Sequence, residues 1–470
     1  HSLAVPPKYR TIGSFWKYYA GIKKAPVLTI FIGGNHEASQ PLHELYYGGW
    51  VAPNIYYLGA AGVVNVGGIR IGGLSGIYKS HDYVQGRFEQ PPYDRSSLRS
   101  VYHVRNVDVY RMKCLTSSVE KIPMDVMLSH DWPQGIEQHG NTDALLRKKP
   151  FFREEVQRNE LGSPANWEVL QTIRPKWWFA AHLHVKFAAQ VQHGVTGTRN
   201  DEAPSVVTSL VPSQVVNQPS SATAHEQTNP SDDTKKDDTT QFRSLESTKA
   251  SCADDDLTDQ MTRFLSLDKC LPRRQHLSIL HLPAAESGKN VRPLRLAYDV
   301  EWLAVLKKTH HLTCPARRRV SVPFKLMPPT EEETEWIKSQ FVDGLEIPNN
   351  FVCTVPPYSP QEPQQHPLPP MGNPQTDRLL QKLELNHIIT TPAFRDVSAR
   401  EVVDENEIDL DSMDDKDEAA TKDENEIDLD DLEEEDAKGT RDDNEIDLDS
   451  VEDEVDEEPA DSSAIKKARV

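Results

Sequence analysis

The stretch that decides the fold is Val27-Leu-Thr-Ile-Phe-Ile-Gly-Gly-Asn-His-Glu37. Its first six residues are mostly β-branched or aromatic, and they predict a buried strand over residues 27–32. Two glycines end that strand, so Asn35, His36 and Glu37 fall on the loop beyond it. Open α/β sheets bind their ligands at the carboxyl ends of central strands. An amide, an imidazole and a carboxylate are therefore expected at a ligand-binding edge.

Two later stretches have the same design. Residues 124–129 predict a strand that runs into His130 and Asp131, and residues 176–181 predict one that runs into His182 and His184. The last two histidines are two residues apart, which places them on one side of an extended chain. Neutral imidazoles together with oxygen donors are typical ligands of zinc, iron or manganese.

Each histidine taken alone has a plainer interpretation. A single histidine after a strand is more often a hydrogen-bonded loop residue than a metal ligand. The order of the motifs carries more weight, since Gly-Asn-His-Glu at 34–37 is followed by His130 and then by the pair His182 and His184. Three strand ends with this chemistry favour one shared metal site.

These motifs resemble the later motifs of calcineurin-like metallophosphoesterases. Longer segments around them resemble, more narrowly, the RNA lariat debranching enzymes. The segments are Ala4-Val-Pro-Pro-Lys-Tyr9, Tyr47-Gly-Gly-Trp-Val-Ala-Pro-Asn-Ile-Tyr-Tyr-Leu58, Gly76-Ile-Tyr-Lys-Ser-His-Asp-Tyr83, Tyr102-His-Val-Arg-Asn106, Ser129-His-Asp-Trp-Pro133 and Ala181-His-Leu-His-Val-Lys-Phe187. The resemblance covers residues 1–190 closely and residues 261–350 more loosely.

The resemblance implies an α/β fold, a metallophosphoesterase β-sandwich flanked by helices, and hydrolysis of the 2′-5′ phosphodiester of excised intron lariats. Such sites hold two divalent metal ions (Mn, Fe or Zn), which relieve the repulsion between an anionic nucleophile and an anionic phosphate. By resemblance, one metal would be bound by Asn35, His130 and His182, and the other by His184. His36 would protonate or stabilise the leaving 2′ oxygen, and Glu37 would orient an imidazole.

The same resemblance expects two earlier metal motifs, a strand-end segment with a histidine and a Gly-Asp-Phe that supplies a bridging aspartate. The sequence contains no Gly-Asp dipeptide. We expect either a piece of a longer gene product or a degenerate relative. Three functions stay open: a debranching enzyme, a catalytically inactive RNA-binding relative, and another metal-dependent phosphodiesterase.

Residues 76–105 are rich in cations and flat rings, which can neutralise phosphates and stack on unpaired bases. The alternative is a solvated loop followed by a helix from about residue 97. The resemblance to the lariat-recognition region favours RNA binding by this segment. The candidate side chains are Lys79, His81, Tyr83, Arg87, Tyr102 and Arg105.

The charge of the 470 residues is unevenly distributed. Residues 401–470 hold 32 acidic and 7 basic side chains, which gives this part a net charge of −25. The whole chain has a net charge of −21, so the other 400 residues carry a net charge of +4. A mildly basic body fits a polyanionic substrate. The five cysteines are odd in number and far apart, which favours a reducing compartment. With no apolar run long enough to span a membrane, we expect a soluble protein of the nucleus, with shuttling to the cytoplasm as an alternative.

Composition predicts four parts of the chain: a catalytic domain (1–192), a flexible polar insert (193–260), a small C-terminal domain (261–350) and a disordered tail (351–470) that is proline-rich and then acidic. The tail repeats one acidic motif at 404–411, 423–430 and 442–449, each copy starting 19 residues after the last. Two apolar residues per copy cannot build a core. The repeats are either a solubilising tail or short motifs that dock a protein partner.

Overall fold

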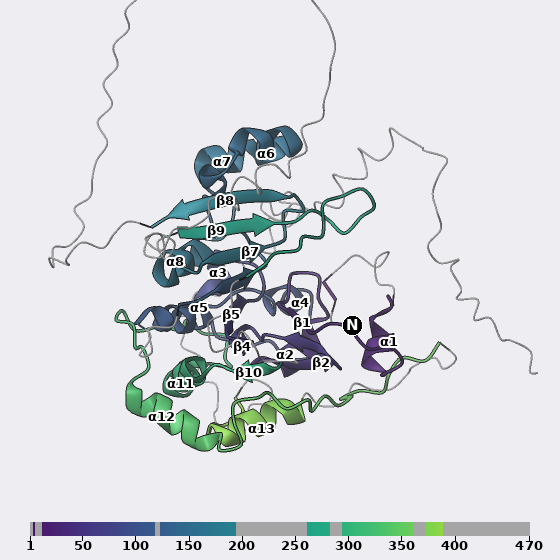
Figure 1. The fold of residues 1–470 in the computed structure, drawn as a ribbon, viewed down its shortest axis with the longest axis vertical. Coiled ribbons are helices and arrows are strands. Elements are labelled where there is room, and N and C mark those ends of the chain that lie inside the picture. The colour runs from purple at the N-terminus through teal and green to yellow at the C-terminus, as the bar shows by residue number, and fades with distance from the viewer. Residues whose placement is uncertain are drawn as a thin grey trace, which may run out of the picture. The chain divides into compact units, whose positions relative to one another are not determined.

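The computed structural model describes residues 3–4, 12–117, 123–193, 261–282, 294–360 and 372–388. Within them the largest element is a seven-stranded sheet in the order β10-β4-β5-β6-β7-β9-β8 (Figure 1). Its strands are β4 (Ala61–Val66), β5 (Ile69–Leu74), β6 (Val126–Ser129), β7 (Trp177–Ala180), β8 (Phe187–Gln192), β9 (Met261–Ser266) and β10 (Leu296–Tyr298).

The centre of this sheet is parallel and its two sides are antiparallel. Strands β5, β6, β7 and β9 run parallel, so their carboxyl ends meet at one edge. The hairpin of β4 and β5 turns at Gly67 and Gly68, whose φ values of 57° and 81° suit a tight hairpin turn.

A second sheet of three strands faces the first. It consists of β1 (Thr29–Phe31), β3 (Ile55–Tyr57) and β2 (Gly49–Ala52), in that order. A shared core joins the two sheets, because Trp50 and Tyr56 of the small sheet pack with Val64 and Leu296 of the large one. The predicted α/β fold with a β-sandwich is therefore confirmed.

Helices flank the sheets (Figure 1). They are α1 (Phe15–Tyr19), α2 (Ser39–Glu44), α3 (Ser80–Tyr83), α4 (Ser97–Ser100), α5 (Asn106–Lys113), α6 (Thr142–Lys148), α7 (Arg153–Arg158), α8 (Pro164–Ile173), α11 (Val300–Thr309), α12 (Glu331–Gln340) and α13 (Pro374–Lys382). At the start of helix α8 the Ser163 side chain accepts the N–H of Asn166, and Pro164 takes the first helical position. None of the described helices is long and apolar enough to cross a membrane.

The C-terminal segment completes the large sheet. Strand β9 lies between β7 and β8, and β10 pairs with β4 at the far edge. Arg70 on β5 is buried against two carboxylates of the C-terminal segment, with its Nε 2.8 Å from Asp299 Oδ2 and its Nη2 2.9 Å from Glu301 Oε2. The predicted start of a separate C-terminal domain at residue 261 stays a prediction. Strands from before and after this residue belong to the same sheet.

The expectation that residues 351–470 lack folded structure is wrong for 351–360 and 372–388. Helix α13 buries Leu379 and Leu380. The Gln375 side chain accepts the N–H of Trp50 at 2.8 Å and donates to the Trp50 carbonyl at 3.0 Å. These hydrogen bonds join residues 325 positions apart, so the composition of the tail did not predict them. The acidic repeats and residues 194–260 of the predicted insert lie outside the described residues.

Candidate metal centre and active site

Three strand ends come together beside the sandwich. β1 is followed by the loop that carries Asn35, β6 runs directly into His130, and β7 is followed by His182. Gly34 allows this approach, because a Cβ on it would lie 2.6 Å from Cε1 of His130. Any side chain at residue 34 would therefore displace the imidazole.

The donor atoms of these three residues converge on one point. Asn35 Oδ1 lies 2.9 Å and His182 Nδ1 lies 3.1 Å from Nε2 of His130. Burial, reinforced by neighbouring histidines, holds the pKa of His130 well below its usual value. A neutral imidazole is the form that binds a metal. An amide oxygen and two imidazole nitrogens so placed fit a divalent metal ion.

Asp131 contacts the His182 imidazole of this cluster. Its Oδ2 accepts the N–H of Tyr78 at 2.7 Å, and its Oδ1 lies 3.6 Å from Nε2 of His182. Burial raises the pKa of Asp131 to about 7. One nitrogen of His182 thus faces the cluster and the other faces a carboxylate, an arrangement that fixes a ligating histidine.

The backbone at the third strand end is strained. His182 has a φ of 63° and His184 a φ of 48°. Residues other than glycine adopt this left-handed region only rarely, and such strain concentrates at functional sites. His184 lies near enough to His130 to help lower its pKa, and among the described residues only His81, Asp82 and His103 form a set of three His, Cys, Asp or Glu ligand atoms within 4.8 Å of one another.

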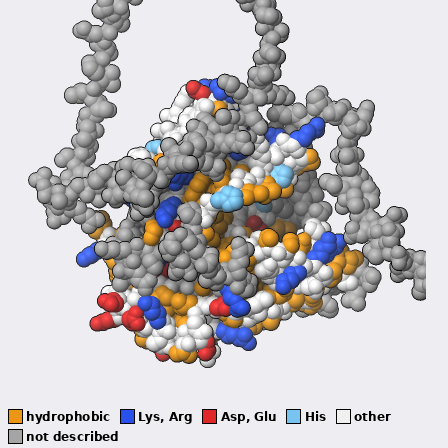
Figure 2. Space-filling view, in the orientation of Figure 1, with side chains coloured by type: hydrophobic (Ala, Val, Ile, Leu, Met, Phe, Trp, Pro, Cys, Tyr) orange, Lys and Arg blue, Asp and Glu red, His pale blue; other side chains and the backbone are white. Residues whose placement is uncertain are grey.

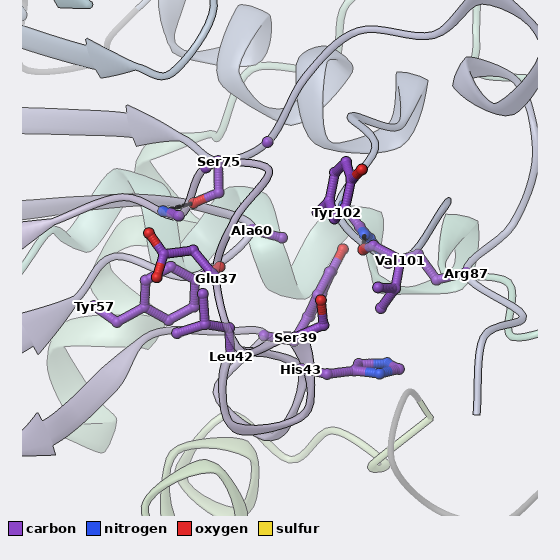
Figure 3. Close-up of a pocket in the computed structure, with 14 residues that line it drawn as sticks. Glu37, Ser39, Leu42, His43, Tyr57, Ala60, Ser75, Arg87, Val101 and Tyr102 are labelled. Carbon is purple, nitrogen blue, oxygen red and sulfur yellow. Dashed lines mark hydrogen bonds between the residues drawn. The ribbon is translucent and has the colours of Figure 1, made fainter. Parts of the chain in front are cut away.

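His36 and Glu37 lie on opposite sides of the loop. His36 is exposed, with its Nε2 3.4 Å from Nδ2 of Asn35. Glu37 instead turns into a cavity of about 40 Å³, beside Tyr57 and Ser75 (Figure 3). Burial raises the pKa of Glu37, while a hydrogen bond from the Gly34 backbone lowers it. The role of Glu37 in orienting an imidazole stays a prediction.

That cavity lies behind the Asn35 loop. The residues around it include Gly33, Gly34, Glu37, Leu42, His43, Arg87 and Tyr102 (Figure 3). A volume of about 40 Å³ holds a few water molecules.

Two of the predicted RNA-binding side chains are instead structural. Arg105 is 1% exposed, and its Nη2 lies 2.5 Å from Oε1 of the buried Glu89. Arg87 donates from Nη2 to Asp108 Oδ2 at 2.7 Å, and its guanidinium lies over the ring of Tyr46. The prediction of RNA contact is wrong for Arg105, and Arg87 is held by the same kind of internal ion pair.

The other four candidates are nearer the surface. His81 is exposed, while Lys79, Tyr83 and Tyr102 are half-buried. On the face shown in Figure 2, lysine and arginine side chains are scattered over several elements, and acidic side chains gather at the lower left, where α12 begins. The described surface on this face therefore carries several separate cations rather than one basic patch.

Sequence reasoning missed the pairing of Asp82 with His103, whose Oδ2 and Nδ1 lie 2.6 Å apart. The two residues are 21 positions apart on a segment without clear periodicity, so only their residue types hinted at it. The contacts of Asp131 were missed for a similar reason, since its partners Tyr78 and His182 lie on other segments of the chain.

Comparisons with known proteins agree with this geometry. A profile described as "Lariat debranching enzyme, C-terminal domain" matches residues 259–388. Proteins named lariat debranching enzyme are 45% identical over 394 residues in Danio rerio, 43% over 385 residues in Schizosaccharomyces pombe and 38% over 428 residues in Arabidopsis thaliana. These alignments cover 82%, 76% and 89% of this chain.

Coverage of the relatives themselves differs between the groups. The chain spans 81% of the Schizosaccharomyces pombe protein and 85% of the Arabidopsis thaliana protein. It spans only 58% of the Danio rerio protein and 59% of the Homo sapiens protein. The similarity therefore extends over most of the fungal and plant proteins and about three fifths of the vertebrate ones.

Proposed function

The chain belongs to the lariat debranching enzyme family, and from that membership we propose that it hydrolyses the 2′-5′ phosphodiester at the branch point of lariat RNA. One observation supports the proposal most directly. Asn35, His130 and His182 come from three strand ends, and their donor atoms lie within hydrogen-bonding distance of His130 Nε2. Ligands that converge in this way can hold a divalent ion, which lowers the pKa of water and stabilises charge in phosphodiester hydrolysis.

We propose that Asn35, His130 and His182 hold one divalent metal ion and that His184 contributes to a second. Imidazole and amide-oxygen ligands suit manganese, iron or zinc. When bound, such ions supply Lewis acidity that polarises a phosphate and lowers the pKa of water. Asp131 would keep His182 in the ligating orientation through the contact at 3.6 Å.

The exposed His36 fits the role of a proton donor. It follows Asn35 directly and lies outside the buried cluster, so its imidazole can reach an oxygen of a substrate bound there. In our proposal it holds the proton that the leaving 2′ oxygen takes up. Lys79, His81, Tyr83 and Tyr102 form the surface of the neighbouring segment, where they would contact phosphates and unpaired bases.

The test is cleavage of a synthetic branched RNA that carries a 2′-5′ and a 3′-5′ bond on the same adenosine. Reactions contain manganese, and mass spectrometry identifies which bond breaks. We expect cleavage at the 2′-5′ bond alone by a version that carries the first two family metal motifs, with a decrease of about 100-fold or more in Asn35→Ala. His311→Gln, at an exposed histidine of the C-terminal segment, is the matched control and should cleave at the parent rate.

The three functions left open by the sequence give different results. Cleavage of both bonds, or of linear RNA at the same rate, indicates another metal-dependent phosphodiesterase. Tight binding of branched RNA without cleavage, both by this chain and by a version with the first two family metal motifs added, indicates a catalytically inactive RNA-binding relative. Either result removes the debranching assignment.

We further propose a nuclear location, because excised introns are produced in the nucleus, and a protein partner for the acidic repeats at 404–411, 423–430 and 442–449. Microscopy of a fluorescent fusion tests the first. Co-purification with the intact chain, compared with a chain in which Ile and Leu of all three repeats are changed to Ser, tests the second. If the same proteins co-purify with the intact chain and with the changed chain, the repeats do not dock a partner and act as a solubilising tail.

A further inference from the structure

A second group of metal-ligating side chains lies on the segment that follows β5. His81 and Asp82 belong to α3, and His103 follows α4. Asp82 Oδ2 lies 2.6 Å from Nδ1 of His103 and 3.3 Å from Nε2 of His81. One carboxylate oxygen is thus placed between two imidazole nitrogens that come from the two ends of the segment.

We propose that His81, Asp82 and His103 form a zinc site separate from the centre at Asn35, His130 and His182. The ligand atoms of the three residues all lie within 4.8 Å of one another. Two imidazoles and one carboxylate form an N/O ligand set that zinc accepts, with a fourth position for water. The two groups share no residue.

The distances fit zinc with a small adjustment. Ligands of a tetrahedral zinc ion at about 2.0–2.1 Å from the metal are roughly 3.3 Å apart. The separation of 3.3 Å between His81 and Asp82 already has this value, and the 2.6 Å between His103 and Asp82 is that of a hydrogen bond. Zinc would replace this hydrogen bond and part the two atoms by well under 1 Å.

Burial supports the same assignment. Asp82 is 6% and His103 is 5% exposed, so both are fixed by their surroundings. The His81 side chain is 67% exposed, which leaves a route by which an ion can enter. Two rigid ligands and one mobile ligand allow the site to load without unfolding the chain.

The site would close the base of the loop between Asp82 and His103, which are 21 positions apart. That loop carries the exposed Arg95 and Arg99, and it is followed by α5. A metal bridge across its base restricts the loop in the way a short cross-link does. Zinc would therefore organise the cationic segment without taking part in hydrolysis.

The test compares zinc affinities of metal-stripped proteins by competition with a chromogenic chelator. All variants carry His130→Asn, which removes the other centre. We expect one zinc ion per chain in this parent, and at least about 10-fold weaker binding after His81→Gln or Asp82→Asn. The matched control, His276→Gln, changes an exposed histidine elsewhere and should bind zinc like the parent.

A second measurement follows the loop itself. Trypsin cleavage after Arg95 and Arg99 should slow several-fold when zinc is added to the parent, and this protection should disappear in His81→Gln. Circular dichroism confirms that His81→Gln is folded, which its exposed position favours. Equal zinc affinity in His81→Gln and His276→Gln, or no zinc bound by the parent, would overturn the proposal and leave the three residues as a hydrogen-bonded cluster.

Discussion

Nδ1 of His182 lies 3.1 Å from Nε2 of His130, although 52 residues separate the two histidines. They come from β6 and β7, which are neighbouring parallel strands. Parallel pairing brings the carboxyl ends of such strands to one edge of the sheet. This pairing alone explains why the two imidazoles lie close together. Asn35 completes the cluster from the other sheet.

Gly34→Ala should weaken metal binding with little change in stability. The new methyl group would lie 2.6 Å from Cε1 of His130 and push the imidazole aside. We expect a loss of metal affinity of about 10–100-fold, as for other changes that reorient a ligand. Isothermal titration with manganese measures it. Gly13→Ala is the control, because a Cβ on Gly13 meets no atom within 4 Å.

Asp131→Asn should also lower metal affinity, by about 10-fold or more, through the orientation of His182. Asparagine can still accept the N–H of Tyr78, so the fold is preserved. Asp125→Asn is the matched control, since Asp125 likewise accepts a backbone N–H, from Arg70 at 2.8 Å, but lies away from the cluster. Equal affinities of the two variants would contradict the positioning role.

His43 should make the protein less stable in acid. Burial lowers its pKa to about 3, with Arg87 adding to the effect. In the unfolded chain its pKa is about 6.5. Between these values only the unfolded chain binds the proton, so stability decreases as the pH falls from 6.5 toward 3. This amounts to roughly 2 kcal/mol between pH 7 and pH 5.

Urea unfolding at both pH values measures this loss. In His43→Gln the decrease between pH 7 and pH 5 should be smaller by that amount, because glutamine does not titrate. His311→Gln, at an exposed histidine, should keep the decrease of the parent protein. A decrease in His43→Gln as large as in the parent would assign the acid sensitivity to other groups.

Asp299→Ala should destabilise the fold strongly. Asp299 binds the buried Arg70 and also accepts the N–H of Trp302 at the start of α11. Removing it breaks the hydrogen bonds of Asp299 with Arg70 and the cap of α11, while Glu301 still pairs with Arg70, so we expect a loss of about 2–4 kcal/mol. Glu346→Ala breaks the exposed pair with Arg295 and should cost no more than about 1 kcal/mol. Denaturant unfolding compares the two, and similar losses would refute the argument.

Local signals made the strands, the hairpin and the start of α8 predictable from the sequence. Alternation, paired glycines and the Ser163-Pro164 cap each act within a few residues. The convergence of His130 and His182 followed because they come after neighbouring parallel strands, whose carboxyl ends share an edge, whereas Asn35 joins them from the other sheet. Arg105 could not be predicted in the same way, since its burial depends on Glu89, which only the tertiary fold places beside it.

Helix α13 was missed because proline and glutamine dominate the composition around it. The helix is held by the burial of Leu379 and Leu380 and by the Gln375 side chain, which bonds to the backbone of Trp50, 325 positions away. No local pattern reports such a partner, so only the three-dimensional arrangement reveals it.

The amide of Gln375 imitates a neighbouring strand. It both accepts and donates at Trp50, on the side of β2 that faces away from β3. Strand β2 forms the rim of its sheet, and an uncovered rim is a template on which a second copy of the chain can add its own strand. Because Gln375 occupies the N–H and C=O of Trp50, it blocks the pairing of a strand from a second copy with β2 at this residue.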